Sequence, residues 1–189
     1  MKRVFIILFM CSIISSFHSS AQEAQTSDEQ TPINKNADKV SIGLGLGLDY
    51  GGFGGNLLIY PQENFGLFGG VGYAFAGAGY NVGAKVRFLS EKNPRTHFYL
   101  MGMYGYNAAI AVTNATKYNK MFYGPSFGIG IDTGKRSYKK GYWTIALLVP
   151  VRDSEVNDYI DYLKDDVGVE FKNGLWPVAF SVAYRFGLD

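Results

Sequence analysis

The sequence is poor in the residues that support disulfide, thiol or helical-membrane architectures. Its single cysteine among 189 residues is Cys11, so the chain beyond it has neither disulfide bonds nor thiolate chemistry. No segment after residue 21 approaches the roughly eighteen apolar residues that a membrane-spanning helix requires. These absences exclude a disulfide-stabilised fold, a thiol enzyme and a bundle of membrane helices.

The chain also lacks an excess of charge once its first segment is set aside. The whole sequence has 18 basic and 16 acidic side chains, and residues 1–21 contain two of the basic and none of the acidic ones. The remaining chain therefore has 16 of each and a formal net charge of zero. Because nucleic-acid binding depends on clustered basic charge, a nucleic-acid partner is not expected.

The N-terminal segment has the pattern of a secretory signal. Lys2 and Arg3 precede an apolar stretch, and Ser19-Ser20-Ala21 offers a small-residue cleavage site. Residues 1–21 are therefore expected to be a cleaved signal peptide. Residues 22–39 are polar and contain no aromatic residue, which predicts a disordered leader.

The folded domain is predicted to span residues 40–189, because all 24 glycines lie between Gly43 and Gly187. Within it, large apolar residues alternate with Gly, Ala, Ser or charged residues, as in residues 43–48 and 176–186. A period of two is typical of strands with two different faces. The alternation predicts eight strands, at residues 40–50, 54–61, 65–76, 79–89, 96–112, 121–132, 142–152 and 175–187.

The two faces of these strands differ in a way that indicates the environment of the sheet. In residues 79–89, Val82 and Val86 share the bulky face, whereas Lys85 and Arg87 share the opposite face. A narrow polar inside and an apolar outside are typical of a transmembrane barrel. The predicted fold class is therefore all-β, an eight-stranded antiparallel transmembrane β-barrel. Residues 96–112 are apolar on both faces, which leaves their phase open.

Proline positions bear on the same prediction, because proline cannot donate a hydrogen bond to a sheet ladder. Pro61 and Pro94 are expected at strand ends or turns. Pro125, Pro150 and Pro177 are expected within a few residues of a loop, so that no proline lies in the middle of a strand.

Aromatic residues lie at the ends of the large apolar face of several predicted strands. Phe65 and Phe75 flank one predicted strand, Tyr80 and Phe88 the next, and the last strand ends Tyr184-Arg185-Phe186. Together with the signal segment and eight alternating segments, this pattern resembles the small outer-membrane β-barrel family of Gram-negative bacteria, and in particular the membrane domain of outer membrane protein A. The resemblance implies an outer-membrane location after export through the inner membrane, contact with outer-membrane lipid and lipopolysaccharide, and periplasmic chain ends.

With that orientation, the connections GGFGG, AGAG and TNATKYNK and residues 153–173 are expected on the outer side of the membrane. The connections PQEN, SEKNPR and TGKRSYKKG are expected on the periplasmic side. The longest connection thus falls on the outer side, as in other barrels of this kind.

The resemblance includes members that cut or transfer lipid acyl chains and that resemble serine hydrolases, in which a histidine pairs with a serine. His97 is the one histidine outside the signal segment and lies near a predicted periplasmic turn. It is interpreted as an interfacial or turn histidine, since a general base must first be placed within reach of its substrate. No catalytic residue, cofactor or metal ligand is assigned, and the chain is not expected to be an enzyme.

Charged residues on the small-residue face form a candidate lumen site. The paired-network interpretation is favoured over a pore lining, because an eight-stranded barrel is only just wide enough for side chains. The pore lining stays open as the alternative. The residues concerned are Asp49, Lys85, Arg87, Asp132, Arg152 and Arg185.

Residues 153–173 form the second candidate site, an acidic connection with a net charge of −5. Val156, Tyr159, Ile160 and Leu163 are spaced as one face of a short amphipathic helix, which Asp153 or Ser154 is expected to cap. The segment is either a solvated lid or a surface for an envelope protein partner or a cation. The expected interaction residues are Glu155, Asp158, Tyr159, Asp161, Tyr162, Asp165 and Asp166.

The function predicted from these features is a structural or interaction role in the cell envelope. A narrow channel for ions or small solutes is the first alternative, and a lipid-modifying enzyme is a weaker one. A soluble ligand-binding barrel predicts the opposite sidedness, with bulky residues inside. The oligomeric state is left open.

Overall fold

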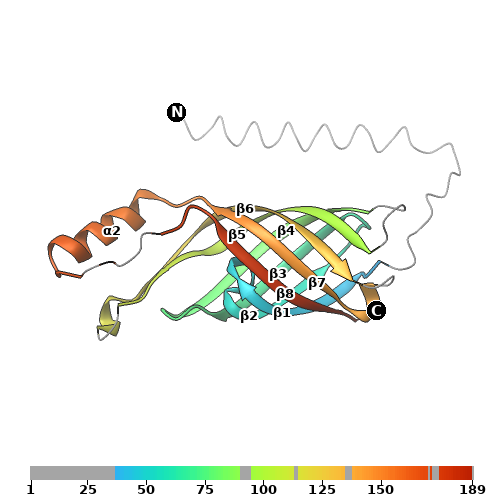
Figure 1. The fold of residues 1–189 in the computed structure, drawn as a ribbon, viewed down its shortest axis with the longest axis horizontal. Helices are drawn as coiled ribbons and strands as arrows, with labels where there is room; N and C mark the ends of the chain where they lie inside the picture. The colour runs from blue at the N-terminus through green and yellow to red at the C-terminus, as the bar shows by residue number, and fades with distance from the viewer. Residues whose placement is uncertain are drawn as a thin grey trace, which may run out of the picture. The chain divides into compact units, whose positions relative to one another are not determined.

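The computed structural model describes residues 37–89, 95–112, 115–134, 138–169, 171 and 175–188. The expected signal peptide and residues 22–36 of the expected leader lie outside this part of the chain. The described residues form a closed antiparallel barrel in which each strand pairs with its sequence neighbours and the last pairs with the first (Figure 1). The strands are β1 (Val40–Gly47), β2 (Gly52–Ile59), β3 (Phe65–Tyr73), β4 (Ala78–Phe88), β5 (Thr96–Ile110), β6 (Lys120–Gly134), β7 (Tyr142–Pro150) and β8 (Ala179–Gly187).

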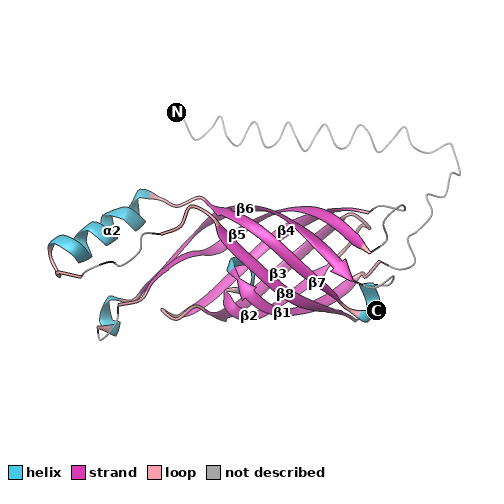
Figure 2. Cartoon of the chain, in the orientation of Figure 1, coloured by secondary structure: helices cyan, strands magenta, loops and turns pink. Residues whose placement is uncertain are grey.

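The predicted all-β architecture of eight antiparallel strands is confirmed. The strand limits differ most at β8, which begins at Ala179 rather than at residue 175. β1 and β3 each end three residues earlier than predicted, at Gly47 and Tyr73. β1 begins and β8 ends at the same end of the barrel, which we call the terminus end. The opposite end, beyond which β5 and β6 project, is the hairpin end (Figure 2).

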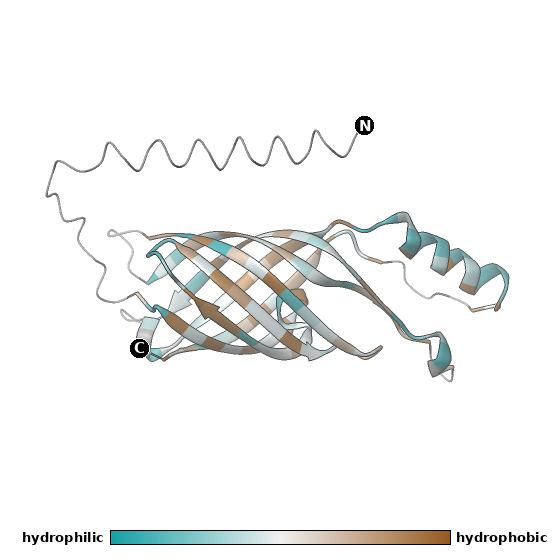
Figure 3. Ribbon diagram, turned by 180° about the vertical axis from the view of Figure 1, so that it is seen from behind, coloured by the Kyte–Doolittle hydropathy of each residue, from teal (hydrophilic) through white to brown (hydrophobic). Residues whose placement is uncertain are grey.

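The predicted sidedness of the strands is confirmed. Leu44 and Phe180 are 60% and 65% exposed on the outer face, whereas Lys85 and Asp132 are 5% and 1% exposed inside. Apolar and polar residues accordingly alternate along the strands (Figure 3). The exposure of the side chains also shows which face of β5 points into the barrel, which the sequence left open. The outward residues are Phe98, Leu100 and Tyr104, and the inward ones are Tyr99, Met101 and Met103.

One proline position was predicted wrongly. Pro125 lies inside β6, where it pairs with Tyr104 of β5. The carbonyl oxygen of Pro125 accepts a hydrogen bond from Val151, just beyond the end of β7. Because the N–H and C=O of a strand residue point to the same side, the missing N–H of Pro125 faces the side where the β7 ladder stops. The ladder with β5 therefore loses no donor.

The connection between β1 and β2 folds into the barrel instead of outward. The expected outer loop GGFGG is mostly the start of β2, and the actual connection is a 3-10 turn, η1 (Leu48–Tyr50), followed by Gly51. All three η1 residues are buried, and the turn contacts β1, β2, β3, β4, β5 and β8. η1 therefore fills the hairpin-end half of the interior.

Glycines on the inner wall make room for η1. A methyl group on Gly70 or Gly72 of β3 would lie 2.3 Å from a main-chain oxygen of Asp49 or Tyr50. The same group on Gly79 of β4 would lie 2.6 Å from the Gly51 oxygen. Such distances are far below van der Waals contact, so these positions need glycine for the close approach of two backbones.

The β5–β6 hairpin and a helix, α2 (Ser154–Asp165), both project beyond the barrel, as Figure 2 shows. The predicted amphipathic helix is confirmed: its residues Val156 and Leu163 are buried against Ala108, Ile110 and Phe122 of the hairpin. The expected side-chain cap is not confirmed, because the Asp153 side chain makes no capping hydrogen bond. It instead accepts a hydrogen bond from the Ser154 hydroxyl. Within the described ranges, no helix is long and apolar enough to cross a bilayer.

The first prediction concerns the glycines of β3 and β4 that face η1. Gly70→Ala should destabilise the barrel by about 1–3 kcal/mol, the usual cost of overpacking, because the new methyl group meets the η1 backbone. Gly69→Ala, at the next residue but on the outer face, should change stability by less than about 1 kcal/mol, since its methyl group has no neighbour closer than 3.8 Å. Urea unfolding midpoints of both variants measure the difference, and equal midpoints would contradict the packing of η1 on this wall.

Candidate functional site

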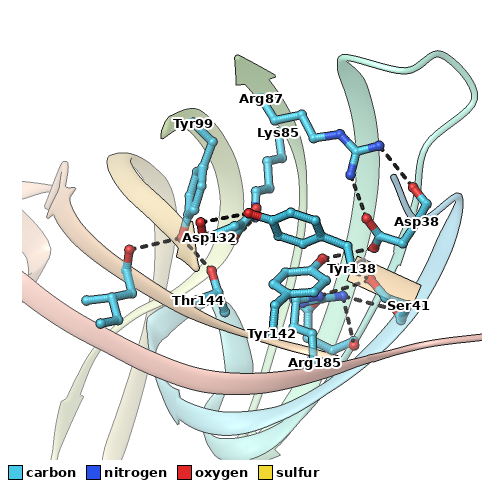
Figure 4. A network of polar contacts seen from close by, with 12 residues as sticks. Asp38, Ser41, Lys85, Arg87, Tyr99, Asp132, Tyr138, Tyr142, Thr144 and Arg185 are labelled. Carbon is cyan, nitrogen blue, oxygen red and sulfur yellow. Dashed lines mark hydrogen bonds and ion pairs between the residues drawn. The ribbon is translucent and has the colours of Figure 1, made fainter. Parts of the chain in front are cut away.

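The barrel interior is the first candidate site, and its charged residues come from several strands and from the segment before β1. Three cations, Lys85, Arg87 and Arg185, and three carboxylates, Asp38, Asp49 and Asp132, are all buried there. Figure 4 shows how most of them come together in one network of polar contacts. Buried charges are strongly destabilising unless they are paired or fully hydrogen-bonded, so the partners of each one decide what the interior can do.

Lys85 of β4 and Asp132 of β6 form an ion pair across the interior. The Lys85 Nζ lies 2.8 Å from Asp132 Oδ2, and both side chains are almost fully buried. The same ammonium lies 3.6 Å from the centre of the Tyr99 ring, which adds a cation–π contact. The Tyr99 hydroxyl is in turn 2.9 Å from Thr144 Oγ1. This pair joins strands that are not neighbours in the sheet.

Arg87 is paired with Asp38, a residue of the predicted disordered leader. Its Nη1 donates to Asp38 Oδ1 at 2.6 Å and its Nη2 to the Asp38 carbonyl oxygen at 2.9 Å. The Tyr142 hydroxyl donates to Asp38 Oδ2 at 2.9 Å. Asp38 is fully buried, so the expected leader boundary at residue 39 is wrong for this residue. Asp38 therefore ties the residues just before β1 to the interior at the terminus end.

The guanidinium of Arg185 on β8 binds neutral groups. It donates to the Tyr50 hydroxyl at 3.0 Å, to Asn56 Oδ1 at 2.9 Å and to Ser41 Oγ at 3.1 Å. Through Tyr50 it ties η1 to the terminus half of the interior. The inward-folded turn and the lumen residues therefore form one connected polar network.

Asp49 belongs to this network as predicted from its charge, but it sits on η1 and not on a strand. Its Oδ1 accepts a hydrogen bond from Ser181 Oγ at 2.5 Å, and its carbonyl oxygen accepts one from Asn56 Nδ2 at 2.9 Å. Asp49 and Arg185 both line an internal cavity of about 10 Å³. A cavity of this size accommodates about one water molecule.

Arg152 does not join the lumen network. It follows the end of β7, is half-buried, and its Nη1 donates to the Trp176 carbonyl oxygen at 2.6 Å. The prediction failed because β7 ends at Pro150, so the alternation that put Arg152 inside stops two residues before it. Arg152 instead ties the end of β7 to the segment that precedes β8.

His97 occupies a different place from the predicted interfacial or turn position. It lies in β5, opposite Asp132 of β6 in the register, and is only 2% exposed. Its ring is 4.9 Å from the ring of Tyr138, which belongs to the turn η3 (Tyr138–Lys140) at the terminus end. The Tyr138 hydroxyl donates to the Asp132 carbonyl oxygen at 3.0 Å. Burial raises the pKa of the Tyr138 phenol, with a smaller contribution from nearby Asp132.

The second candidate site is the exposed side of α2. Of the predicted interaction residues, Glu155, Asp158, Asp161, Tyr162, Asp165 and Asp166 are exposed. Tyr159 is half-buried, because its hydroxyl donates to the Tyr118 carbonyl oxygen at 2.9 Å and its ring packs on Phe122. Glu155 forms an ion pair with Lys120 of β6 at 2.8 Å. Glu170 and Lys172 lie outside the described residues.

The lumen pairing generates the second prediction. Asp132→Asn should lower the free energy of unfolding by about 3–5 kcal/mol, because it leaves the Lys85 ammonium buried without its counter-charge. Replacing both partners with apolar residues, Lys85→Met with Asp132→Leu, should recover most of that loss. A double-mutant cycle made of Lys85→Met, Asp132→Leu and the double variant, followed by urea unfolding, measures the coupling. Additive effects of the two single substitutions would contradict a direct pair.

Comparison with known proteins assigns no family to the chain. No family model matches the sequence, and no curated protein matches it. The observations that bear on function are therefore the closed barrel with its exposed apolar outer face, the filled interior, and the acidic helix that projects beyond the hairpin end.

Proposed function

We propose that this chain is an integral outer-membrane β-barrel protein with a structural or interaction role in the cell envelope, and that it presents the acidic segment 153–173 to the outside. The observation that carries the proposal is the sidedness of a closed barrel. Large apolar side chains are exposed around its whole outer face while charges are buried inside.

The exposed apolar surface supports a lipid environment. Every strand contributes to it, for example Leu57 of β2, Leu67 of β3, Val82 of β4, Leu100 of β5 and Leu147 of β7, each at least 44% exposed. Soluble monomers rarely expose contiguous apolar patches of more than a few hundred Å². A partner protein covers one side of a barrel, whereas a bilayer surrounds it. Closure of the sheet also leaves no unpaired strand edge along the barrel wall.

Aromatic side chains mark both ends of this surface. Exposed rings lie toward the hairpin end at Phe53, Tyr73, Tyr80, Tyr104 and Trp176. Others lie toward the terminus end, namely Phe65, Phe88, Phe98, Trp143 and Phe186. Amphipathic rings favour the headgroup region, so two girdles support a barrel that spans the membrane between them. The resemblance to small outer-membrane barrels adds the orientation, with the terminus end in the periplasm.

The interior disfavours the channel alternative. The Lys85–Asp132 and Arg87–Asp38 pairs cross the terminus half, and η1 fills the other half. The cavity between them has room for about one water molecule. A closed barrel whose interior is filled by paired side chains is better suited to a structural role than to the conduction of ions.

A lipid-modifying activity is not proposed. His97, the histidine that such an activity would need, faces the interior and packs on Tyr138 at the terminus end. It is far along β5 from the hairpin end, where outer-leaflet lipid would be reached in the proposed orientation.

The third prediction tests the membrane location through the two tryptophans. Trp143 and Trp176 are 52% and 73% exposed and belong to opposite girdles. In vesicles that contain brominated phosphatidylcholine, the fluorescence of Trp143→Phe and of Trp176→Phe should be quenched, because each variant keeps one ring in contact with lipid. Absence of quenching in both variants, together with release of the protein by a salt wash, would favour the soluble barrel.

The fourth prediction separates the scaffold from the channel. In planar bilayers the wild-type protein and Arg87→Ala should both show no unit conductance, since η1 and the Lys85–Asp132 pair still block the interior of the variant. A reproducible unit conductance of the wild type whose ion selectivity changes in Arg87→Ala would establish the channel instead.

A further inference from the structure

The turn between β3 and β4, at the hairpin end of the barrel, has an unusual composition for a connection in contact with water. It consists of residues 74–77, Ala-Phe-Ala-Gly, none of which has a polar side chain. No charged residue lies between Glu63 and Lys85, so the uncharged stretch is much longer than the turn itself. Turns that face water are typically rich in Asn, Asp, Ser, Gly and Pro. The composition of this turn therefore indicates an apolar environment.

Phe75 in this turn is the most exposed large apolar residue in the described part of the chain, at 87%. Its φ of 47° lies in the left-handed region, which glycine adopts freely and a bulky residue adopts only at a cost. The Ala76 N–H donates to the Ala74 carbonyl oxygen across it, as in a strained three-residue turn. A strained backbone that presents an exposed aromatic ring indicates that the ring itself has a function.

The tyrosines around the turn form an exposed aromatic surface together with Phe75. The Tyr73 hydroxyl donates to the Phe75 carbonyl oxygen at 3.4 Å, and the Tyr123 hydroxyl of β6 donates to the Ala78 carbonyl oxygen at 3.1 Å. The Tyr123 ring stacks on that of Tyr80, with centroids 4.8 Å apart. The hydroxyls of Tyr73 and Tyr123 are therefore bonded to the main chain of the turn region, and their rings remain exposed.

The height of the turn places Phe75 at the proposed membrane surface. Tyr73 and Tyr80 belong to the girdle at the hairpin end, and Phe75 follows Tyr73 by two residues. Two residues of a strand tilted by about 45° rise about 5 Å. The headgroup layer on each side of a bilayer is about 5–8 Å thick. The Phe75 ring is therefore within reach of that layer.

We propose that the β3–β4 turn is a membrane anchor, in which the Phe75 ring inserts between the lipid headgroups of the outer leaflet and contacts the upper part of their acyl chains. The turn continues the exposed apolar face of β3 and β4, where Val71 and Val82 are 67% and 60% exposed. A protein partner fits less well, because protein interfaces have polar rims with hydrogen bonds and the side chains of residues 74–77 offer none. The inference rests on the proposed function, since it requires a barrel that spans a membrane.

Depth-dependent fluorescence quenching tests the anchor. Trp143→Phe with Trp176→Phe removes both tryptophans of the chain, and Phe75→Trp in this background introduces a single reporter at the turn. The protein is reconstituted into phosphatidylcholine vesicles that are brominated either near the glycerol end of the acyl chain or in its middle. The Phe75→Trp reporter should be quenched by both lipids, and more strongly by the bromines near the glycerol end.

Two further reporters in the same background separate the anchor from the membrane assignment. Val82→Trp, on the outer face of β4, should be quenched by both lipids. Tyr162→Trp, on the exposed side of α2, should be quenched by aqueous iodide and by neither lipid. Quenching of Val82→Trp without quenching of Phe75→Trp would overturn the anchor and leave the membrane assignment intact. Absence of quenching in both would contradict the proposed function as well.

Stability in vesicles gives a second test that does not depend on tryptophan at the turn. Asparagine adopts left-handed backbone more readily than leucine, so Phe75→Asn should be the more stable variant if the turn lies in water. If the turn lies in lipid, Phe75→Leu keeps an apolar side chain there and should have the higher urea midpoint. A midpoint of Phe75→Asn equal to or above that of Phe75→Leu would rule out the anchor.

Discussion

Inside a closed eight-stranded sheet, a charged side chain must find its partners among the other interior residues, because bulk water has no room there. This constraint organises the barrel. Lys85 is neutralised by Asp132 and Arg87 by Asp38, while Arg185 is held by Tyr50, Asn56 and Ser41. These contacts join the segment before β1, the inward turn η1 and non-neighbouring strands into one network. Because the charges are paired inside, the outer face can consist of apolar residues. The proposed membrane location depends on this apolar outer face.

The same constraint explains the glycine content of the inner wall. The terminus half is filled mainly by side chains, whereas the hairpin-end half is filled by a piece of backbone, η1, and β3 and β4 face it with glycines. The main-chain oxygens that η1 brings inside also need donors, and Asn56 and Asn81 supply them for Asp49 and Leu48. Small residues, amide side chains and paired buried charges therefore act together to fill the narrow interior.

The alternation of the sequence was sufficient to predict eight strands, their order and their sidedness, because a period of two depends only on strand geometry. It failed where the chain leaves that geometry. η1 was expected to continue a strand, Arg152 follows the end of β7, and Asp38 precedes β1 in a polar segment. Their positions depend on contacts with distant residues, such as Arg87 for Asp38, and no local pattern reports those. α2 was predicted because its apolar stripe is a local pattern.

The central claim, that the bulky face of each strand contacts lipid and the small face contacts the filled interior, is tested most directly by a spin-label scan of β4. The chain has one cysteine, Cys11, in the predicted signal segment, so single cysteines at residues 80–88 are labelled cleanly. In bilayers, labels at Tyr80, Val82, Ala84, Val86 and Phe88 should be accessible to oxygen and shielded from a water-soluble nickel complex, with the intervening positions shielded from both. Accessibility of the same five positions to the nickel complex would contradict the account.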